Sequence, residues 1–247
     1  GSSAFSNCDG LTRVVLPDSI ETLGNGVFRD CERLNEVNYP LSLKKGGDDL
    51  FKGCPQMTSF IIPEGVTTIP DDVLAGCNYL KDVKLPSTLT TIPGFAFKNC
   101  TSLLNIVLPN AVTEIGWAAF QDCSSLLNIA LPNGVKVIKQ SAFLNCTSMT
   151  HVDIPATVTE IQYRAFGGCT SLLDIVLPNG VQWIRQDAFR DCIAMTRIDI
   201  PATVTSIESA AFSGCTNLKI YCERGSYALE YAIANGIPYV ELSPAGV

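Results

Sequence analysis

A cysteine recurs every 23 residues along almost the whole chain. Nine prolines, each nine residues after a cysteine, keep the same step, as does a phenylalanine column in which Leu74 is the lone substitute. Because no insertion breaks the period, we expect a stack of similar coils in which each covers the apolar face of the next. The repeated cysteines are Cys8, Cys31, Cys54, Cys77, Cys100, Cys123, Cys146, Cys169, Cys192 and Cys215.

The repeat unit reads C-x-x-L-x-x-V-x-L-P-x-x-V-x-x-I-x-x-x-A-F-x-x. In the coil after Cys100, the spacing of Leu103, Ile106 and Leu108 predicts a strand with one buried face. Pro109 is expected to end that strand, since proline has no N–H to give to a ladder. Val112 and Ile115 then predict a second extended or turn segment.

The pattern lapses from Tyr221 onward. Ala228, Leu229, Ala232 and Ile233 have helical spacing, and Gly236 stands where a helix would stop. We therefore expect a solenoid of about nine to ten coils over residues 1–220 and a C-terminal cap and tail over residues 221–247.

The chain begins within a repeat. Ala4 and Phe5 align with Ala119 and Phe120 of a later coil. We therefore expect the natural protein to extend beyond Gly1 and regard this sequence as N-terminally truncated.

This unit resembles the BspA-like leucine-rich repeat, a bacterial-type class whose 23-residue consensus contains L-x-x-I-x-L-P and A-F-x-x-C. The resemblance extends from about Ala4 to about Leu242. It implies a curved, right-handed repeat solenoid with a parallel β-sheet on the concave face, short strands and turns on the other side, and a helical cap. It also implies an extracellular or cell-surface location, and in some members a role as an adhesin.

The eleven cysteines are expected to be mostly buried free thiols. Zinc sites need cysteines two to four residues apart, which this spacing does not provide. Thiols on adjacent coils would lie near the strand spacing of about 4.8 Å, wider than the ~3.8 Å between the Cβ atoms of a disulfide. The sequence leaves open whether Cys215 forms a disulfide with Cys222, the one cysteine outside the period.

Charge and motifs narrow the classes of function. The net charge is −7 with no basic stripe, so we expect no binding to nucleic acid or anionic membranes. No apolar run reaches the ~18 residues of a membrane span. His151 is the one histidine through which a nucleophilic triad could run, and no phosphate-binding loop is present. We expect no catalytic residues, no cofactor and no metal.

The residues five and seven after each cysteine are expected to point outward from the strand. We name His151, Asp174 and Arg197 as adjacent rungs of one column, with Asp153 and Asp199 beside them, as candidate ligand-binding residues. The alternative is a solvated ladder of opposite charges. Exposed aromatic residues also anchor partners, so the flank offers a second candidate site, unless these side chains simply pack on their neighbours. They are Trp117, Tyr163 and Trp183.

Several functions are compatible with this sequence. We favour a non-enzymatic, monomeric binding or adhesion module that recognises a protein or glycan ligand. A structural spacer that presents a separate domain is the main alternative, and an accessory to a carbohydrate-processing enzyme is a third. An intracellular scaffold stays open, because reduced cysteines suit a reducing compartment.

Overall fold

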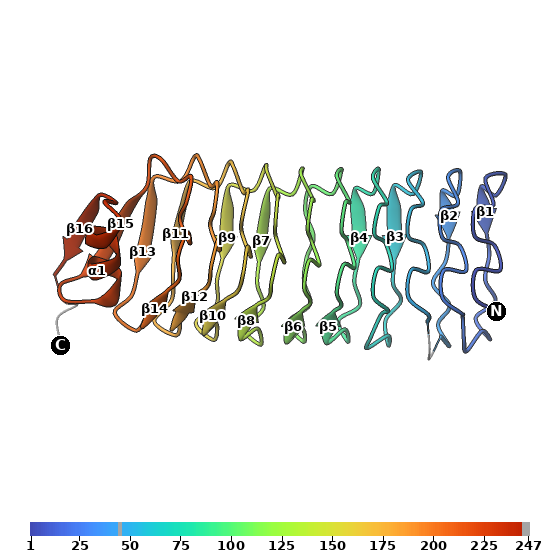
Figure 1. Ribbon diagram of the computed structural model, residues 1–247. Helices are drawn as coiled ribbons and strands as arrows, with labels where there is room; N and C mark the ends of the chain where they lie inside the picture. The colour runs from blue at the N-terminus through green and yellow to red at the C-terminus, as the bar shows by residue number, and fades with distance from the viewer. Residues whose placement is uncertain (44–45, 244–247) are drawn as a thin grey trace.

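Each coil supplies residues for one wall of a solenoid, which we call the front wall (Figure 1). The computed structural model describes residues 1–43 and 46–243. Apart from the last two strands, the front-wall strands pair in parallel with partners 23 residues apart, as Asp174 does with Arg197. The coil after Cys100 forms no strand over residues 103–108, contrary to the prediction, although Leu103, Ile106 and Leu108 are buried. The front-wall strands are β1 (Arg13–Val14), β2 (Glu36–Val37), β3 (Ser59–Ile61), β4 (Asp82–Lys84), β7 (Asn128–Ala130), β9 (His151–Asp153), β11 (Asp174–Val176), β13 (Arg197–Ile200), β15 (Lys219–Glu223) and β16 (Tyr239–Leu242).

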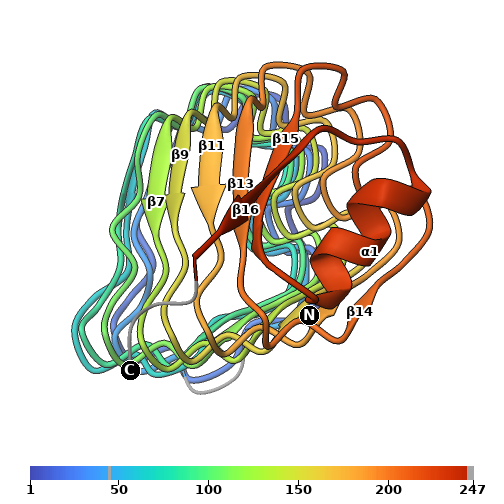
Figure 2. The same cartoon turned by 90° about the vertical axis from the view of Figure 1, so that its left-hand side faces the viewer.

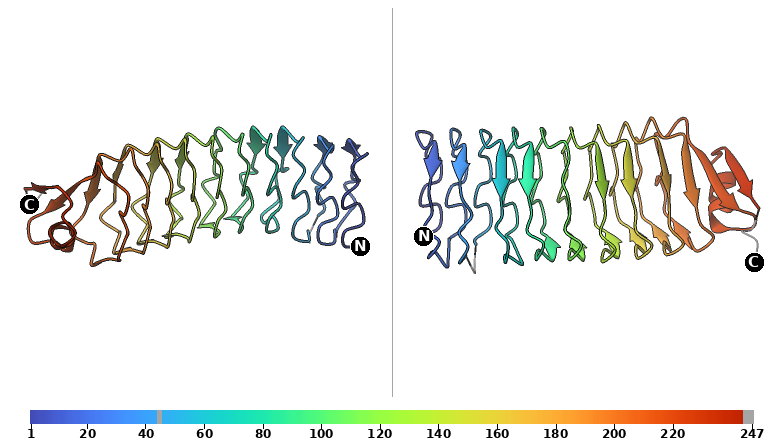
Figure 3. Two further views of the ribbon diagram at one scale, coloured as in Figure 1. Left: turned by 45° about the horizontal axis from the view of Figure 1, so that its top comes forward. Right: turned by 180° about the vertical axis from the view of Figure 1, so that it is seen from behind.

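A second series of strands follows the proline in the middle and late coils. These two-residue strands, also parallel, occupy the position for which Val112 and Ile115 predicted an extended segment. They run along another side of the solenoid (Figure 3). The series comprises β5 (Thr91–Ile92), β6 (Glu114–Ile115), β8 (Val137–Ile138), β10 (Glu160–Ile161), β12 (Trp183–Ile184) and β14 (Ser206–Ile207).

The five residues before each cysteine form a third side, which we call the flank. Two backbone positions per coil are left-handed there: the residue before the cysteine, and the residue four positions earlier. The first position holds Asn, Asp or Gly in every coil, the residue types that tolerate positive φ. Hydrogen bonds between coils continue along the flank, as from Asn145 N to the Gly167 carbonyl at 2.8 Å.

The core is a single cluster that follows the solenoid axis. The phenylalanine column stacks ring on ring, with centroids of Phe120 and Phe143 5.5 Å apart and their planes 3° apart. Leu74, which replaces phenylalanine, is fully buried and interrupts the stack. Such spacing lies in the range favoured by aromatic pairs.

The cysteines line the same core. All eleven are free thiols, including Cys215 and Cys222, so the structure contains no disulfide between these two. In nine successive coils the thiol donates a hydrogen bond to a carbonyl 26 residues earlier, as Cys146 does to Phe120 at 3.2 Å. These cysteines therefore satisfy buried carbonyls as well as filling space.

A helix and a final strand cover the last coil. Helix α1 (Tyr227–Ala234) begins after Ser226, whose hydroxyl accepts a hydrogen bond from Leu229 N at 3.3 Å. The helix ends before Gly236, which has φ of +64°, as the sequence predicted. Ala228 and Ala232 are buried, but Ile233 is 60% exposed and so does not share their buried face. Strand β16 then pairs with β15, an element that the helical spacing did not predict.

Candidate binding surfaces

The front wall presents two exposed columns of side chains. Strands β3, β4, β7, β9 and β11 each show an exposed, buried, exposed pattern, which confirms that the residues five and seven after the cysteine point outward. The buried residue between them packs in the core. Figure 2 shows β7, β9, β11 and β13 side by side on this wall. The period therefore fixes which side chains lie on neighbouring rungs.

The charged patch consists of the five candidate residues His151, Asp153, Asp174, Arg197 and Asp199. Strands β11 and β13 place Asp174 opposite Arg197, and Val176 opposite Asp199. His151 lies on β9, one coil before β11 (Figure 2). The structure thus brings the five residues onto three successive coils of one wall.

Side chains two residues apart pair within β9 and within β13. His151 Nε2 lies 2.9 Å from Asp153 Oδ1. Arg197 donates two hydrogen bonds to Asp199, from Nε at 2.6 Å and from Nη2 at 2.7 Å. The bonds to Asp199 raise the pKa of Arg197 above its ordinary value. Among the described residues, Asp174 makes no ion pair, so its exposed carboxylate is the uncommitted acceptor of the patch.

Tyr221 extends this patch, although the repeat pattern did not mark it. The Arg197 guanidinium lies 4.2 Å from the centre of the Tyr221 ring, within cation–π range. The last coil is one residue shorter, because Arg197 pairs with Lys219, 22 residues later. That shift moves Tyr221 opposite Asp199, where an unbroken period would place another residue.

The three candidate aromatics, Trp117, Tyr163 and Trp183, lie just before the five flank residues or in the second strand series, and their surroundings differ. Trp117 is 51% exposed and packs edge-on against Phe95, with ring centroids 4.0 Å apart. The Arg164 guanidinium lies over the Tyr163 ring, 5.1 Å from its centre. Trp183 is half-buried in β12, and the Arg185 guanidinium lies over its ring, 5.9 Å from the ring centre. Each aromatic is therefore packed on residues of its own neighbourhood, and Trp117 is the most exposed of the three.

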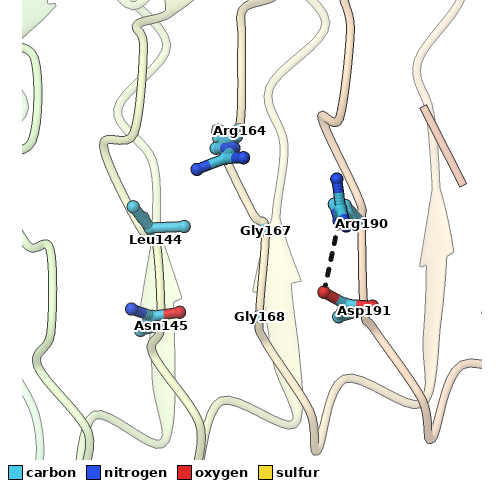
Figure 4. Close-up of a pocket in the computed structure, with 7 residues that line it drawn as sticks. All are labelled: Leu144, Asn145, Arg164, Gly167, Gly168, Arg190 and Asp191. Carbon is cyan, nitrogen blue, oxygen red and sulfur yellow. Dashed lines mark hydrogen bonds and ion pairs between the residues drawn. The ribbon is translucent and has the colours of Figure 1, made fainter. Parts of the chain in front are cut away.

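A shallow cavity of about 280 Å³ opens on the flank between residues 144 and 191 (Figure 4). Arg164 and Arg190 border it, and Gly168 lies between Asn145 and Asp191. The side chain of Asp187 is 3% exposed and lies 3.5 Å from Arg164 Nε and 3.7 Å from Arg190 Nη1. Arg190 also pairs with Asp191. Because these two acids balance the two arginines, the cavity is not a strong anion site.

Neither a metal-binding cluster nor a membrane-spanning helix occurs in the described ranges, residues 1–43 and 46–243. No cluster of three histidine, cysteine or acidic side chains is arranged to hold a metal ion there. Within the same ranges, no helix has the length and apolar character needed to cross a bilayer.

Three solved structures are similar to this chain. A leucine-rich repeat protein of T. pallidum is 28% identical over 74% of this chain and 77% of its own, with a TM-score of 0.58. One from Eubacterium ventriosum is 21% identical over 86% of this chain and 78% of its own, with a TM-score of 0.62. A leucine-rich cell surface protein from Faecalibacterium prausnitzii is 26% identical over 90% and 82%, with a TM-score of 0.46.

Comparison with proteins of curated function found no match. The sequence does match the profile of the BspA type leucine rich repeat region, in six copies over residues 1–126 and 90–219. These segments contain the cysteine, proline and phenylalanine columns that build the solenoid. The chain belongs to the BspA-type leucine-rich repeat family.

Proposed function

We propose that this chain is a non-enzymatic adhesion or recognition module that binds a protein or glycan partner through its exposed surface. One observation carries the proposal: along the front wall the buried rungs keep nearly the same apolar residues, whereas the exposed rungs change in charge and size from coil to coil. A regular scaffold that carries an irregular exposed surface is suited to recognition.

The charged patch is the part of the front wall best equipped to hold a partner. It combines the uncommitted carboxylate of Asp174, the Arg197–Asp199 pair and the ring of Tyr221. Val176, which is 66% exposed, lies between the acidic residues. Hydrogen-bond acceptors, a guanidinium and apolar area on one surface are typical of protein interfaces.

The proposed location is the cell surface or the extracellular space. Its support is membership of a family in which such locations are frequent. The net charge of −7 also makes nucleic acid an unfavourable partner. We further propose that the module acts as a monomer.

The proposal predicts that removing two carboxylates from the patch weakens binding without unfolding the protein. The immobilised protein is screened against purified extracellular proteins and a glycan array, and binders are measured by surface plasmon resonance. Asp174→Ala together with Asp199→Ala should raise Kd at least about tenfold, or about 1.4 kcal/mol. Both side chains lie outside the core, so thermal unfolding should change little.

A matched control changes the same two columns elsewhere. Asp82→Ala together with Lys84→Ala alters exposed residues of β4, four coils before β11, and should leave Kd unchanged. Equal affinity of the patch variant and the parent would exclude the charged patch as the binding site. A screen without any saturable binder would argue against a recognition role.

A further inference from the structure

A second flank cavity, of about 340 Å³, lies among the early coils, from Asp30 to Asn99. Its floor is formed by Gly53 and Gly76, which occupy the column before the cysteine in successive coils. Asp30 and Asn99 stand in the same column on either side. We call this cavity the glycine notch.

The absence of a side chain on Gly53 leaves the notch open beside Gly76, unlike the cavity of Figure 4 beside Gly168. A Cβ placed on Gly76 would meet only the backbone of Gly53, at 3.4 Å. By contrast, a Cβ on Gly168 would lie 2.3 Å from Asn145 Oδ1, because an asparagine occupies the preceding coil. A Cβ on Gly53 would likewise lie 2.1 Å from Asp30 Oδ1. The glycine notch is therefore open at Gly76, over one rung of about 5 Å at the usual strand spacing.

An aromatic side chain borders the notch at an unusual backbone position. Phe95 has φ of +54°, in a column that otherwise holds Ser, Gly, Asp, Ala and Arg. The Trp117 ring is inclined by 64° to the Phe95 ring, at a centroid distance of 4.0 Å. Phe95 is half-buried, so part of its ring stays open to the notch.

The polar groups around Phe95 are balanced in charge. Lys52 donates hydrogen bonds to Asp72 at 2.9 Å and to Asp49 at 3.1 Å. Within the described part of the chain Lys98 forms no ion pair, and its ammonium lies 5.2 Å from the Phe95 ring. Asn99 adds an exposed amide. Donors and acceptors thus line the notch without a strong net charge.

We propose that the glycine notch binds a neutral saccharide. The C–H face of a sugar ring would pack on Phe95. Its hydroxyl groups would accept from Lys98, donate to the Asp72 carboxylate and exchange hydrogen bonds with the Asn99 amide. A small apolar platform with a few convergent polar groups is the usual composition of such sites. This inference refines the proposed recognition role but places the ligand on a surface separate from the charged patch.

Tryptophan fluorescence provides a direct measurement. The chain has two tryptophans, so Trp183→Phe leaves Trp117 as the single reporter, in contact with Phe95. The protein is titrated with cellotetraose, maltotetraose and mannotetraose, and with tetragalacturonic acid as an acidic comparison. At least one neutral tetrasaccharide should give a saturable change and bind more tightly than the acidic one.

Two variants in this background test the site with little risk to the fold. Phe95→Ala removes the platform, and Ala118 and Ala210 already occupy the same column with φ of 51° and 59°. Gly76→Asn fills the floor with a residue that recurs in that column, as at Asn99 and Asn145. Saturation-transfer NMR, which does not depend on Trp117, should show at least about a tenfold loss of affinity for each, or about 1.4 kcal/mol.

Controls separate this proposal from the front-wall function. Gly168→Asn fills the other flank cavity, and Asp174→Ala with Asp199→Ala alters the charged patch; both should bind the tetrasaccharide like the parent. The proposal is overturned if no neutral tetrasaccharide binds, if the acidic one binds more tightly, or if Phe95→Ala and Gly76→Asn retain full affinity. None of these results depends on whether the front wall has a partner.

Discussion

Nine of the ten periodic cysteines pack against the core and also donate a hydrogen bond from the thiol. The carbonyl of Phe120 accepts from the backbone N–H of Cys123 at 3.2 Å and from the thiol of Cys146 at 3.2 Å. An alanine would leave the second acceptor site of that buried carbonyl empty. The sequence predicted burial of the cysteines from their period, but not this bond, because the carbonyl's direction depends on the left-handed turn of the flank.

Burial should make the stability of the protein sensitive to alkaline pH. Desolvation raises the pKa of the Cys54 and Cys169 thiols to about 12. An unfolded thiol ionises near pH ~8.5. The stabilisation is therefore complete below that pH and is lost as the pH rises toward 12, since only the unfolded state releases the proton.

Cys169→Ala measures this effect at one site. The variant should be less stable than the parent at pH 8, and the difference should shrink by roughly 2 kcal/mol at pH 10, because alanine has no proton to lose. Thermal unfolding of both proteins at both pH values gives the comparison, and Tyr39 and other titrating groups cancel because both proteins contain them. A difference that is equal at pH 8 and pH 10 would contradict a thiol kept protonated by burial.

At the scale of single elements, the repeat pattern predicted those parts whose side chains alternate. Periodic burial predicted helix α1 and the front-wall strands of most coils. It was wrong for the coil after Cys100, where Leu103, Ile106 and Leu108 are buried but form no strand, and it did not predict β16. The flank was missed, although its column of Asn, Asp and Gly was a signal for left-handed backbone. Phe95 and Arg164 gave no such signal, since bonds between coils, such as Phe95 N to the Trp117 carbonyl at 3.0 Å, hold their conformation.

The sequence predicted the candidate site only in part. The period alone places Asp174 opposite Arg197, so that contact between rungs followed from the sequence. The bond from Arg197 to Asp199 depends on the choice of rotamer, which the period does not fix. The position of Tyr221 depends on the missing residue in the last coil, and the glycine notch depends on the conformation of the flank.

The stacked phenylalanines offer a test of packing between coils. Phe120 is fully buried between Phe97 and Phe143, with centroids 5.3 and 5.5 Å away. Phe120→Ala should reduce the free energy of unfolding by roughly 3–5 kcal/mol, because it opens a cavity within the stack. Phe5→Ala is the matched control from the same column: Phe5 is 51% exposed, so its loss should cost far less. Equal unfolding curves for the two variants would refute the central role of the stack.

For the whole molecule, stability comes from contacts between neighbouring coils. Backbone hydrogen bonds join the coils along the front wall, the second strand series and the flank, and one core cluster runs through them. Strands β1 and β16 lie at opposite ends of the stack (Figure 1). In a solenoid of this kind, a coil interacts with the coil before it and the coil after it. The length of the stack should therefore be adjustable in whole coils.

Deletion of residues 124–146 tests this property. The deletion joins Cys123 to Thr147, which normally follows Cys146, so each column continues in register and Phe120 meets Phe166. The variant should keep its circular dichroism per residue and a cooperative thermal transition, and its maximum dimension in small-angle scattering should shorten by about 5 Å. The charged patch lies beyond the deletion and should bind as in the parent.

Deletion of residues 124–135 is the control. It removes half a coil and sets front-wall residues against the second strand series, so it should prevent folding. If both deletions behaved alike, the coil would not be the structural unit of the molecule.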